Sequence, residues 1–134
     1  MAIADDGELL IIAPGLERFG EDLDIDGLIR KYGYVGTEKI LKLVEENEDL
    51  RENLSAAAHL IHGSSEGRFN ITFACSNISR EEVEGVNFNY ITIKKAQERY
   101  NLDSLKDGYN DIEGKEVYYI DNPATGLWAT KDKF

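Results

Sequence analysis

The stretch HLIHGSSEGRFNITFAC, residues 59–75, joins a helix to a strand through an unusually polar connection. Gly63 is a natural end for the Ala-rich helix that precedes it. Residues 69–75 alternate apolar and polar types and are rich in aromatic and β-branched side chains, which predicts a strand. A plain connection needs a glycine and one or two polar residues, whereas this one holds two serines, a glutamate and an arginine. The question is whether this polar corner is a functional site or a stiff turn.

Working outward, strand and helix patterns alternate along the chain. Further strands are predicted at 8–13, 87–93 and 115–120, and the first of these, ELLIIA, is a continuous apolar run typical of a buried strand in a parallel sheet. Helical patterns lie between the strands. The order predicts an α/β fold with a mostly parallel sheet flanked by helices, a Rossmann-like three-layer sandwich, in a single domain of residues 1–134.

Capping residues and apolar stripes place the predicted helices. Residues 24–33 form one helix that ends at Gly33, and Ser79 with Glu82 forms a capping box for another. Thr37 is expected to be the N-cap of the next helix and Asn47 the N-cap of a second. The expected stripe of the first is Ile40, Leu41 and Val44, and that of the second is Leu50, Leu54, Ala57, Ala58 and Ile61. If Gly63 is a left-handed C-cap, Gly63→Val should destabilise by about 1 kcal/mol or more.

Composition and charge exclude several classes of function. The 134 residues are 42% hydrophobic and 31% charged, with a formal net charge of −11. This charge argues against nucleic acid and against an anionic membrane surface, because both require clustered Lys and Arg. No apolar run reaches the roughly 18 residues of a membrane span, and the first residues do not resemble a signal peptide. The single cysteine, Cys75, reads as a small buried residue and fits a cytoplasmic location.

Two edges of the predicted sheet could carry a site. Ligands of open parallel sheets usually bind beyond the carboxyl ends of the strands, where the loops 14–22, 76–82 and 121–128 are expected. Glu17 and Arg18 lie in the first of these loops. The polar corner leads from a helix into a strand and therefore lies at the opposite edge. As an active site it would have to face another domain or subunit.

The corner itself has two interpretations. In the first, the Ser64 and Ser65 hydroxyls and Arg68 satisfy the free carbonyl groups at the helix end. In the second, Arg68 binds a carboxylate or phosphate in its guanidinium fork while the two serines donate to the same ligand. No glycine-rich phosphate motif and no Walker lysine accompany the corner.

The two histidines next to the corner do not predict a metal site. His59 and His62 are three residues apart and can share a helix surface, with His62 flanking the apolar stripe and His59 on the far side. Zinc requires three or four protein ligands, and the chain has no further histidine. Structural or interface roles are therefore expected for both.

Two segments resemble a known family. Residues 5–22, DDGELLIIAPGLERFGED, and 54–100, with HLIHGSSEGRF (59–69) and SREEVEGVNFNY (79–90) at their centre, resemble the C-terminal domain of LarA-like proteins. This is the nickel-pincer-dependent lactate racemase family, and the branch most similar to the chain is that of the sugar-acid epimerases of the mannonate type. The similarity runs over roughly residues 5–128.

The resemblance implies part of an enzyme. Family members have two α/β domains with the active site between them, and they move a hydride from C2 of a 2-hydroxy acid to a nickel-bound pyridinium cofactor and back. The catalytic histidine pair and the cofactor lysine belong to the N-terminal domain, whose motifs have no match here. The implied role is therefore a domain that carries no catalytic residue, binds no cofactor by itself, is inactive alone and completes a cleft with its N-terminal partner around a small hydroxy acid. The implied cleft-lining residues are His62, Ser64, Ser65, Glu66 and Arg68, with Glu17 and Arg18 as the competing face.

Two other classes of function stay open. The chain could be a stand-alone binding module for a small anionic ligand, held by Arg68 and the serines. It could instead be a structural or oligomerisation domain without a ligand, which would bury a large apolar patch against a symmetry mate in a homo-oligomer.

Overall fold

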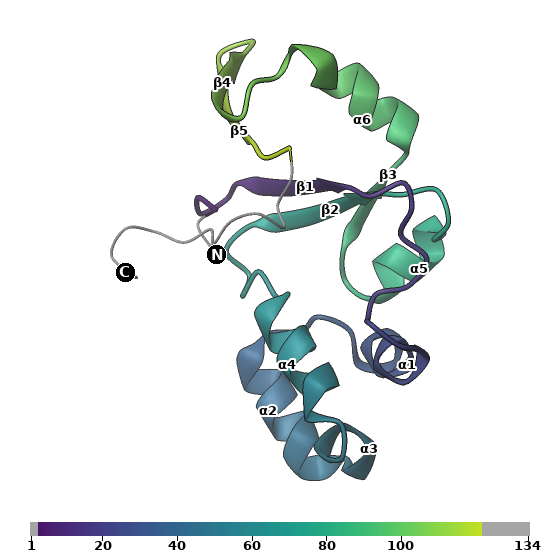
Figure 1. The fold of residues 1–134 in the computed structure, drawn as a ribbon. Helices are drawn as coiled ribbons and strands as arrows, with labels where there is room; N and C mark the ends of the chain where they lie inside the picture. The colour runs from purple at the N-terminus through teal and green to yellow at the C-terminus, as the bar shows by residue number, and fades with distance from the viewer. Residues whose placement is uncertain (1–2, 122–134) are drawn as a thin grey trace. The chain divides into compact units, whose positions relative to one another are not determined.

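Residues 3–121 are described by the computed structural model (Figure 1), in which the chain divides into two compact units. The first unit spans Ile3–Ile93, and the second begins at Lys94. Within the described residues, no helix has both the length and the apolar character that crossing a membrane requires. The predicted loop 121–128 falls, apart from its first residue, outside the described part of the chain.

The first unit is built on a three-stranded parallel sheet in the order β1-β2-β3. Glu8 of β1 lies opposite Asn70 of β2, and Thr72 of β2 lies opposite Asn89 of β3. The predicted α/β class and parallel pairing are thus confirmed for these strands. β1 is half-buried rather than buried, because it is an edge strand and only β2 has neighbours on both sides. The strands span Glu8–Ile12 (β1), Asn70–Ala74 (β2) and Asn89–Ile91 (β3).

Five helices lie between these strands in the sequence. Four are between β1 and β2, and one is between β2 and β3: α1 (Leu23–Tyr32), α2 (Thr37–Glu46), α3 (Glu48–Arg51), α4 (Leu54–His62) and α5 (Arg80–Gly85). The predicted end of α1 at Gly33 and the predicted capping box of Ser79 with Glu82 at α5 are both confirmed. Asp22 caps α1 by accepting a hydrogen bond from the Ile25 N–H.

The prediction of one continuous helix after Asn47 is wrong, because the structure has two helices there, α3 and α4. Asn53 caps α4 by accepting a hydrogen bond from the Ala56 N–H at 3.2 Å. The break shifts the phase of the buried face, so that Ala56, Ala57 and Leu60 are buried, whereas the predicted stripe residue Leu54 is 63% exposed. Leu41 of α2 is likewise exposed, and Leu43 packs against the core in its place.

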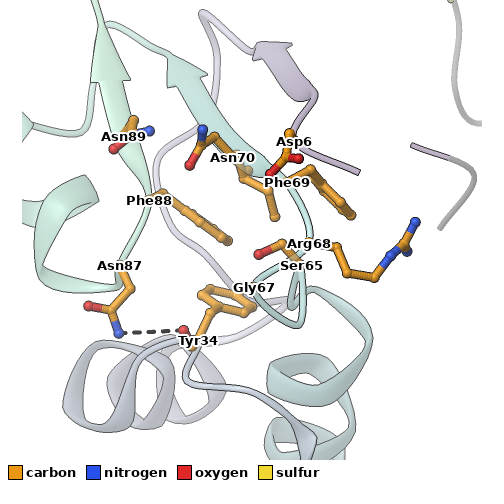
Figure 2. Close-up of a pocket in the computed structure, with 11 residues that line it drawn as sticks. Asp6, Tyr34, Ser65, Gly67, Arg68, Phe69, Asn70, Asn87, Phe88 and Asn89 are labelled. Atoms are coloured by element: carbon orange, nitrogen blue, oxygen red, sulfur yellow. Dashed lines mark hydrogen bonds between the residues drawn. The ribbon is translucent and has the colours of Figure 1, made fainter. Parts of the chain in front are cut away.

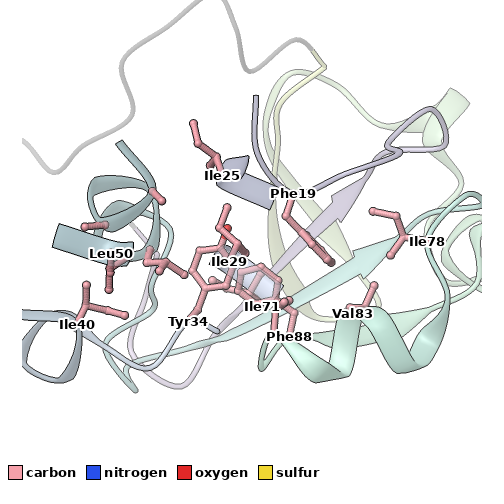
Figure 3. Close-up of a cluster of buried hydrophobic side chains, with 14 of the residues drawn as sticks. Phe19, Ile25, Ile29, Tyr34, Ile40, Leu50, Ile71, Ile78, Val83 and Phe88 are labelled. Carbon is pink, nitrogen blue, oxygen red and sulfur yellow. The ribbon is translucent and has the colours of Figure 1, made fainter. Parts of the chain in front are cut away.

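One hydrophobic core joins the helices to one face of the sheet (Figure 3). The sheet contributes Ile71 and Phe88, with Phe73 and Tyr90 partly buried beside them. Because side chains alternate along a strand, these residues share one face. The helices contribute fully buried residues, among them Ile29, Ile40, Leu50, Leu60 and Val83. The second helical layer of a Rossmann-like sandwich stays a prediction.

The second unit contains α6 (Ile93–Arg99) from its second residue on, a short 3₁₀ helix (Leu102–Ser104) and a β-hairpin of β4 (Gly108–Ile112) and β5 (Lys115–Tyr119). The predicted last strand is confirmed, but it pairs antiparallel with β4, which was not predicted, and not with the parallel sheet. The hairpin turn places Glu113 at φ 51° and Gly114 at φ 82°. Two successive positive φ angles are what a two-residue hairpin turn of type I′ requires.

The first testable prediction concerns Gly63. The structural reason for a glycine at this position differs from the expected left-handed conformation. Gly63 is the C-cap of α4, but its φ of −84° is not left-handed. A Cβ at this position would lie 2.5 Å from Cε1 of Tyr34 and 3.1 Å from the His59 carbonyl oxygen. Gly63→Ala is therefore expected to lower the free energy of unfolding by about 1–3 kcal/mol through overpacking, as measured by urea denaturation.

A matched control lies in α1. Gly27 is inside the helix and has nothing within 4 Å of an added Cβ. Gly27→Ala should raise stability by about 0.5–1 kcal/mol, since alanine is the better helix former. Equal effects of the two substitutions would reject the close approach of Tyr34 as the reason for Gly63.

Candidate functional site

The corner, residues 63–68, turns sharply between α4 and β2. Glu66 and Gly67 follow one another at φ 54° and 74°, in the left-handed region. The Arg68 N–H donates to the Ser65 carbonyl oxygen at 3.0 Å, and the Ser64 hydroxyl oxygen accepts a hydrogen bond from the Glu66 N–H at 3.1 Å. Ser64 is thus used within the turn itself.

Glu66 caps a helix that lies far away in the sequence. Its two carboxylate oxygens accept hydrogen bonds from the Thr37 N–H at 2.9 and 3.2 Å, and the Thr37 hydroxyl donates to one of them as well. The predicted N-cap at Thr37 is therefore wrong by one position: Gly36 stands at the cap and Thr37 is the first residue of α2. A carboxylate at this place also faces the positive end of the helix dipole.

Arg68 already holds a carboxylate of this chain. Its Nε donates to Oδ1 of Asp5 at 2.7 Å, and its terminal nitrogen donates to the Ile3 carbonyl oxygen at 2.8 Å. The Asp6 N–H donates to the Arg68 carbonyl oxygen in return. These contacts tie the segment before β1 to the corner.

The two histidines are placed the other way round from the prediction. His59 is half-buried, and its Nδ1 lies 2.9 Å from the hydroxyl of Tyr34, whereas His62 is exposed. The reversal has the same cause as the exposure of Leu54, because the break before α4 shifts the helix phase. Within residues 3–121 there is no group of three His, Cys, Asp or Glu side chains suited to a metal ion.

A polar pocket of about 240 Å³ opens at the amino ends of β2 and β3, beside the corner (Figure 2). Its floor is aromatic: Tyr34 and Phe88 line it, and their rings stack at 4.3 Å between centroids. Outside the pocket, Phe88 stacks in turn on Phe73 at 5.0 Å. Burial raises the pKa of the Tyr34 hydroxyl. The rim consists of polar side chains from the corner and from the two strands: Asp6, Ser65, Arg68, Asn70, Asn87 and Asn89.

The corner residues of the sequence prediction divide between this pocket and its neighbour. Ser65 and Arg68 line the polar pocket, while Ser64, Ser65 and Glu66 line an adjacent depression together with Gly36 and Lys39. His62 lines neither of these two pockets. The competing pair, Glu17 and Arg18, follows β1 and is therefore at the opposite edge of the parallel sheet, where both side chains are exposed.

The asparagines of the pocket were missed in the sequence. Phe69-Asn70 and Phe88-Asn89 are the same dipeptide at the start of two strands. Because adjacent parallel strands start at one edge, this repetition could have placed both asparagines together. Asn87 adopts a φ of 72°, and its amide nitrogen donates to the Tyr34 carbonyl oxygen at 3.4 Å.

The opposite edge is held by a charged network. Asp26 is buried; one carboxylate oxygen accepts from the Phe19 N–H at 2.7 Å and the other from Arg30 at 2.8 Å. Arg30 continues to Glu82 at 2.7 Å. The network joins the loop after β1 to α1 and α5.

Comparisons with known proteins identify one similar structure. No family model matches the sequence, and no curated protein matches it. The crystal structure of a Thermotoga maritima protein, a target of the Northeast Structural Genomics Consortium, is similar with a TM-score of 0.60 and 27% sequence identity over 72% of this chain. The match covers 25% of the Thermotoga protein, so this chain spans about a quarter of that protein's length. The likeness supports the α/β class of the fold.

The cap on α2 generates the second prediction. Glu66→Ala should lower stability by about 0.5–2 kcal/mol, the usual cost of losing a capping side chain. Glu66→Gln keeps an acceptor and loses only the interaction of charge with the helix dipole, worth about 0.3–1 kcal/mol. Urea denaturation of the two variants measures the contribution of the cap and the contribution of its charge to the free energy of unfolding. Glu46→Ala, in the last turn of the same helix, serves as the control and should stay within about 0.5 kcal/mol.

The third prediction concerns acid. The pKa of the Glu82 carboxyl is lowered from its ordinary value of 4.5 to about 2. The largest cause is the hydrogen bond from the Ser79 N–H, and the second is the hydrogen bond from the Arg30 guanidinium. A lowered pKa in the folded state stabilises the fold above pH 4.5, and this stabilisation is lost as the pH falls from 4.5 through about 2. The stability difference between the wild type and Glu82→Gln should therefore be constant near neutral pH and shrink below pH 4.5. A difference that does not change between neutral pH and pH 3 would contradict the assignment.

Proposed function

We propose that this chain is the C-terminal domain of a LarA-like 2-hydroxy-acid racemase or epimerase, of the branch that acts on sugar acids. In this role it completes an interdomain cleft with a catalytic N-terminal domain and is inactive alone. A cytoplasmic location belongs to the same proposal, since the single cysteine cannot form a disulfide within the chain.

One observation carries the proposal. The two segments on which the resemblance chiefly rests, 59–69 and 79–90, are separated in the sequence but meet at the polar pocket. The first contributes Ser65, Gly67, Arg68 and Phe69 to the lining, and the second contributes Asn87, Phe88 and Asn89. The likeness to a quarter of a much longer Thermotoga protein also supports a role as one part of a larger protein.

The residues that the structure describes, 3–121, do not fit the nickel cofactor. They offer no group of three metal-ligating side chains, and Cys75 is buried with a pKa raised by desolvation. The part that falls to this chain is positioning: hydroxyl and carboxamide groups of the pocket, such as those of Ser65 and Asn89, would orient the hydroxyl-bearing end of a sugar acid at the edge of the cleft, with its carboxylate directed away from Asp6.

The proposed alternative, a module that binds a small anion through Arg68, has less support. The guanidinium fork that would receive the anion contacts Asp5 and Ile3 instead. Asp6 adds a second carboxylate to the pocket lining, so an anionic ligand would meet negative charge there.

A mixing experiment tests the proposed function. The full chain is added to the cofactor-loaded N-terminal domain of a LarA-like sugar-acid epimerase, and C2 epimerisation of sugar acids is followed by NMR. Activity is expected only in the mixture. Asn89→Ala should lower the rate of the mixture, whereas Asn77→Ala at the opposite edge should not. Failure of the two domains to associate, with no epimerisation, would contradict the proposal.

A further inference from the structure

The polar pocket is lined by hydrogen-bonding side chains that are available to a ligand. Within residues 3–121, the side chains of Ser65, Asn70 and Asn89 line the pocket and make no hydrogen bond. Asn87 uses its amide nitrogen on the Tyr34 carbonyl oxygen. Figure 2 shows Asn70 and Asn89 on neighbouring strands at one side of the hollow, with Ser65 and Tyr34 at the other. The groups come from three separate segments of the chain and converge on one small volume.

The charges around the pocket select against an anion. Arg68, the cation of the rim, is neutralised by Asp5 at 2.7 Å. Asp6 also lines the pocket, and within the described part of the chain its carboxylate forms no ion pair. The remaining formal charge at the rim is therefore negative, in a chain whose net charge is already −11.

The size and the floor limit the ligand to a single ring. A volume of about 240 Å³ lies just below the roughly 300–1,000 Å³ of pockets for drug-sized ligands. The floor is rigid, because the Tyr34 ring is stacked on Phe88 and its hydroxyl is bonded to His59. Carboxamides donate and accept hydrogen bonds at once, as hydroxyl groups do. The three asparagines and the serine of the rim thus match adjacent hydroxyls, which also donate and accept.

From these features we infer that the polar pocket binds a neutral polyhydroxylated molecule, a monosaccharide in its ring form, and that the chain binds it without a partner domain. Asn70 and Asn89 hydrogen-bond adjacent hydroxyls from the strand side, and Ser65 does so from the corner. This binding is independent of the proposed epimerase function, which requires a second domain.

The test compares two ligands that differ mainly in charge. The ¹⁵N-labelled full chain is titrated with D-glucose and, separately, with D-gluconate, and the side-chain amide resonances of Asn70, Asn87 and Asn89 are followed. Saturable shifts with D-glucose at millimolar concentration are expected, with D-gluconate several-fold weaker. The absence of saturable shifts with D-glucose, or tighter binding of D-gluconate, overturns the inference.

Variants assign the binding to the pocket. Asn89→Ala should weaken D-glucose binding roughly threefold to tenfold, the usual effect of one lost hydrogen bond. Asn77→Ala, an exposed asparagine at the carboxyl edge of the sheet, is the matched control and should bind as the wild type does. Asn70→Ala provides a second pocket variant, so that the test does not depend on one protein folding. Unchanged affinity in both pocket variants overturns the assignment.

Because no catalytic domain or cofactor is present in the titration, failure to bind D-glucose is distinguishable from failure of the mixing experiment.

Discussion

The buried ring of Tyr34 is the contact on which the first unit depends. The ring lies against Gly63 at the end of α4, where a side chain would collide with it, and it stacks on Phe88, the residue before β3. Its hydroxyl is bonded to His59, and its backbone N–H donates to the Val86 carbonyl oxygen at 3.1 Å. One residue between α1 and α2 thus connects α4 and the sheet. It also forms the floor of the polar pocket, so stability and the candidate site share the same packing.

The main role of the polar corner in this structure is that of a stiff turn. Its glutamate caps α2, its arginine ties down the segment before β1, and one of its serines is used inside the turn. Each of these charged or polar groups has a partner in this chain, which explains why so polar a connection between helix and strand is stable. Ser65 differs, because its side chain lines the pocket and its hydroxyl makes no hydrogen bond within the turn.

The two sheet edges have opposite chemistry. At the carboxyl edge, where ligands of parallel sheets usually bind, Asp26, Arg30 and Glu82 satisfy one another and fasten the loop after β1. At the amino edge, Asn70 and Asn89, whose carboxamides make no hydrogen bond within residues 3–121, line a pocket with an aromatic floor. A domain that carries such carboxamides at its amino edge is suited to present them to a ligand that a second domain could share. This arrangement supports the proposed place of the chain in a larger enzyme.

The sequence by itself determined the local elements. The strands at 8–13, 69–75 and 87–93, the end of α1 at Gly33 and the capping box at Ser79 follow from residue pattern and short-range hydrogen bonds, which act within a few residues. Tertiary structure decided what long-range contacts control. A carboxylate 29 residues away caps α2, the break at Asn53 turns His59 inward and His62 outward, and strand pairing places β5 in a hairpin of its own. The pocket belongs to this second group, since its asparagines become neighbours only when β2 and β3 pair in parallel and bring their amino ends to one edge.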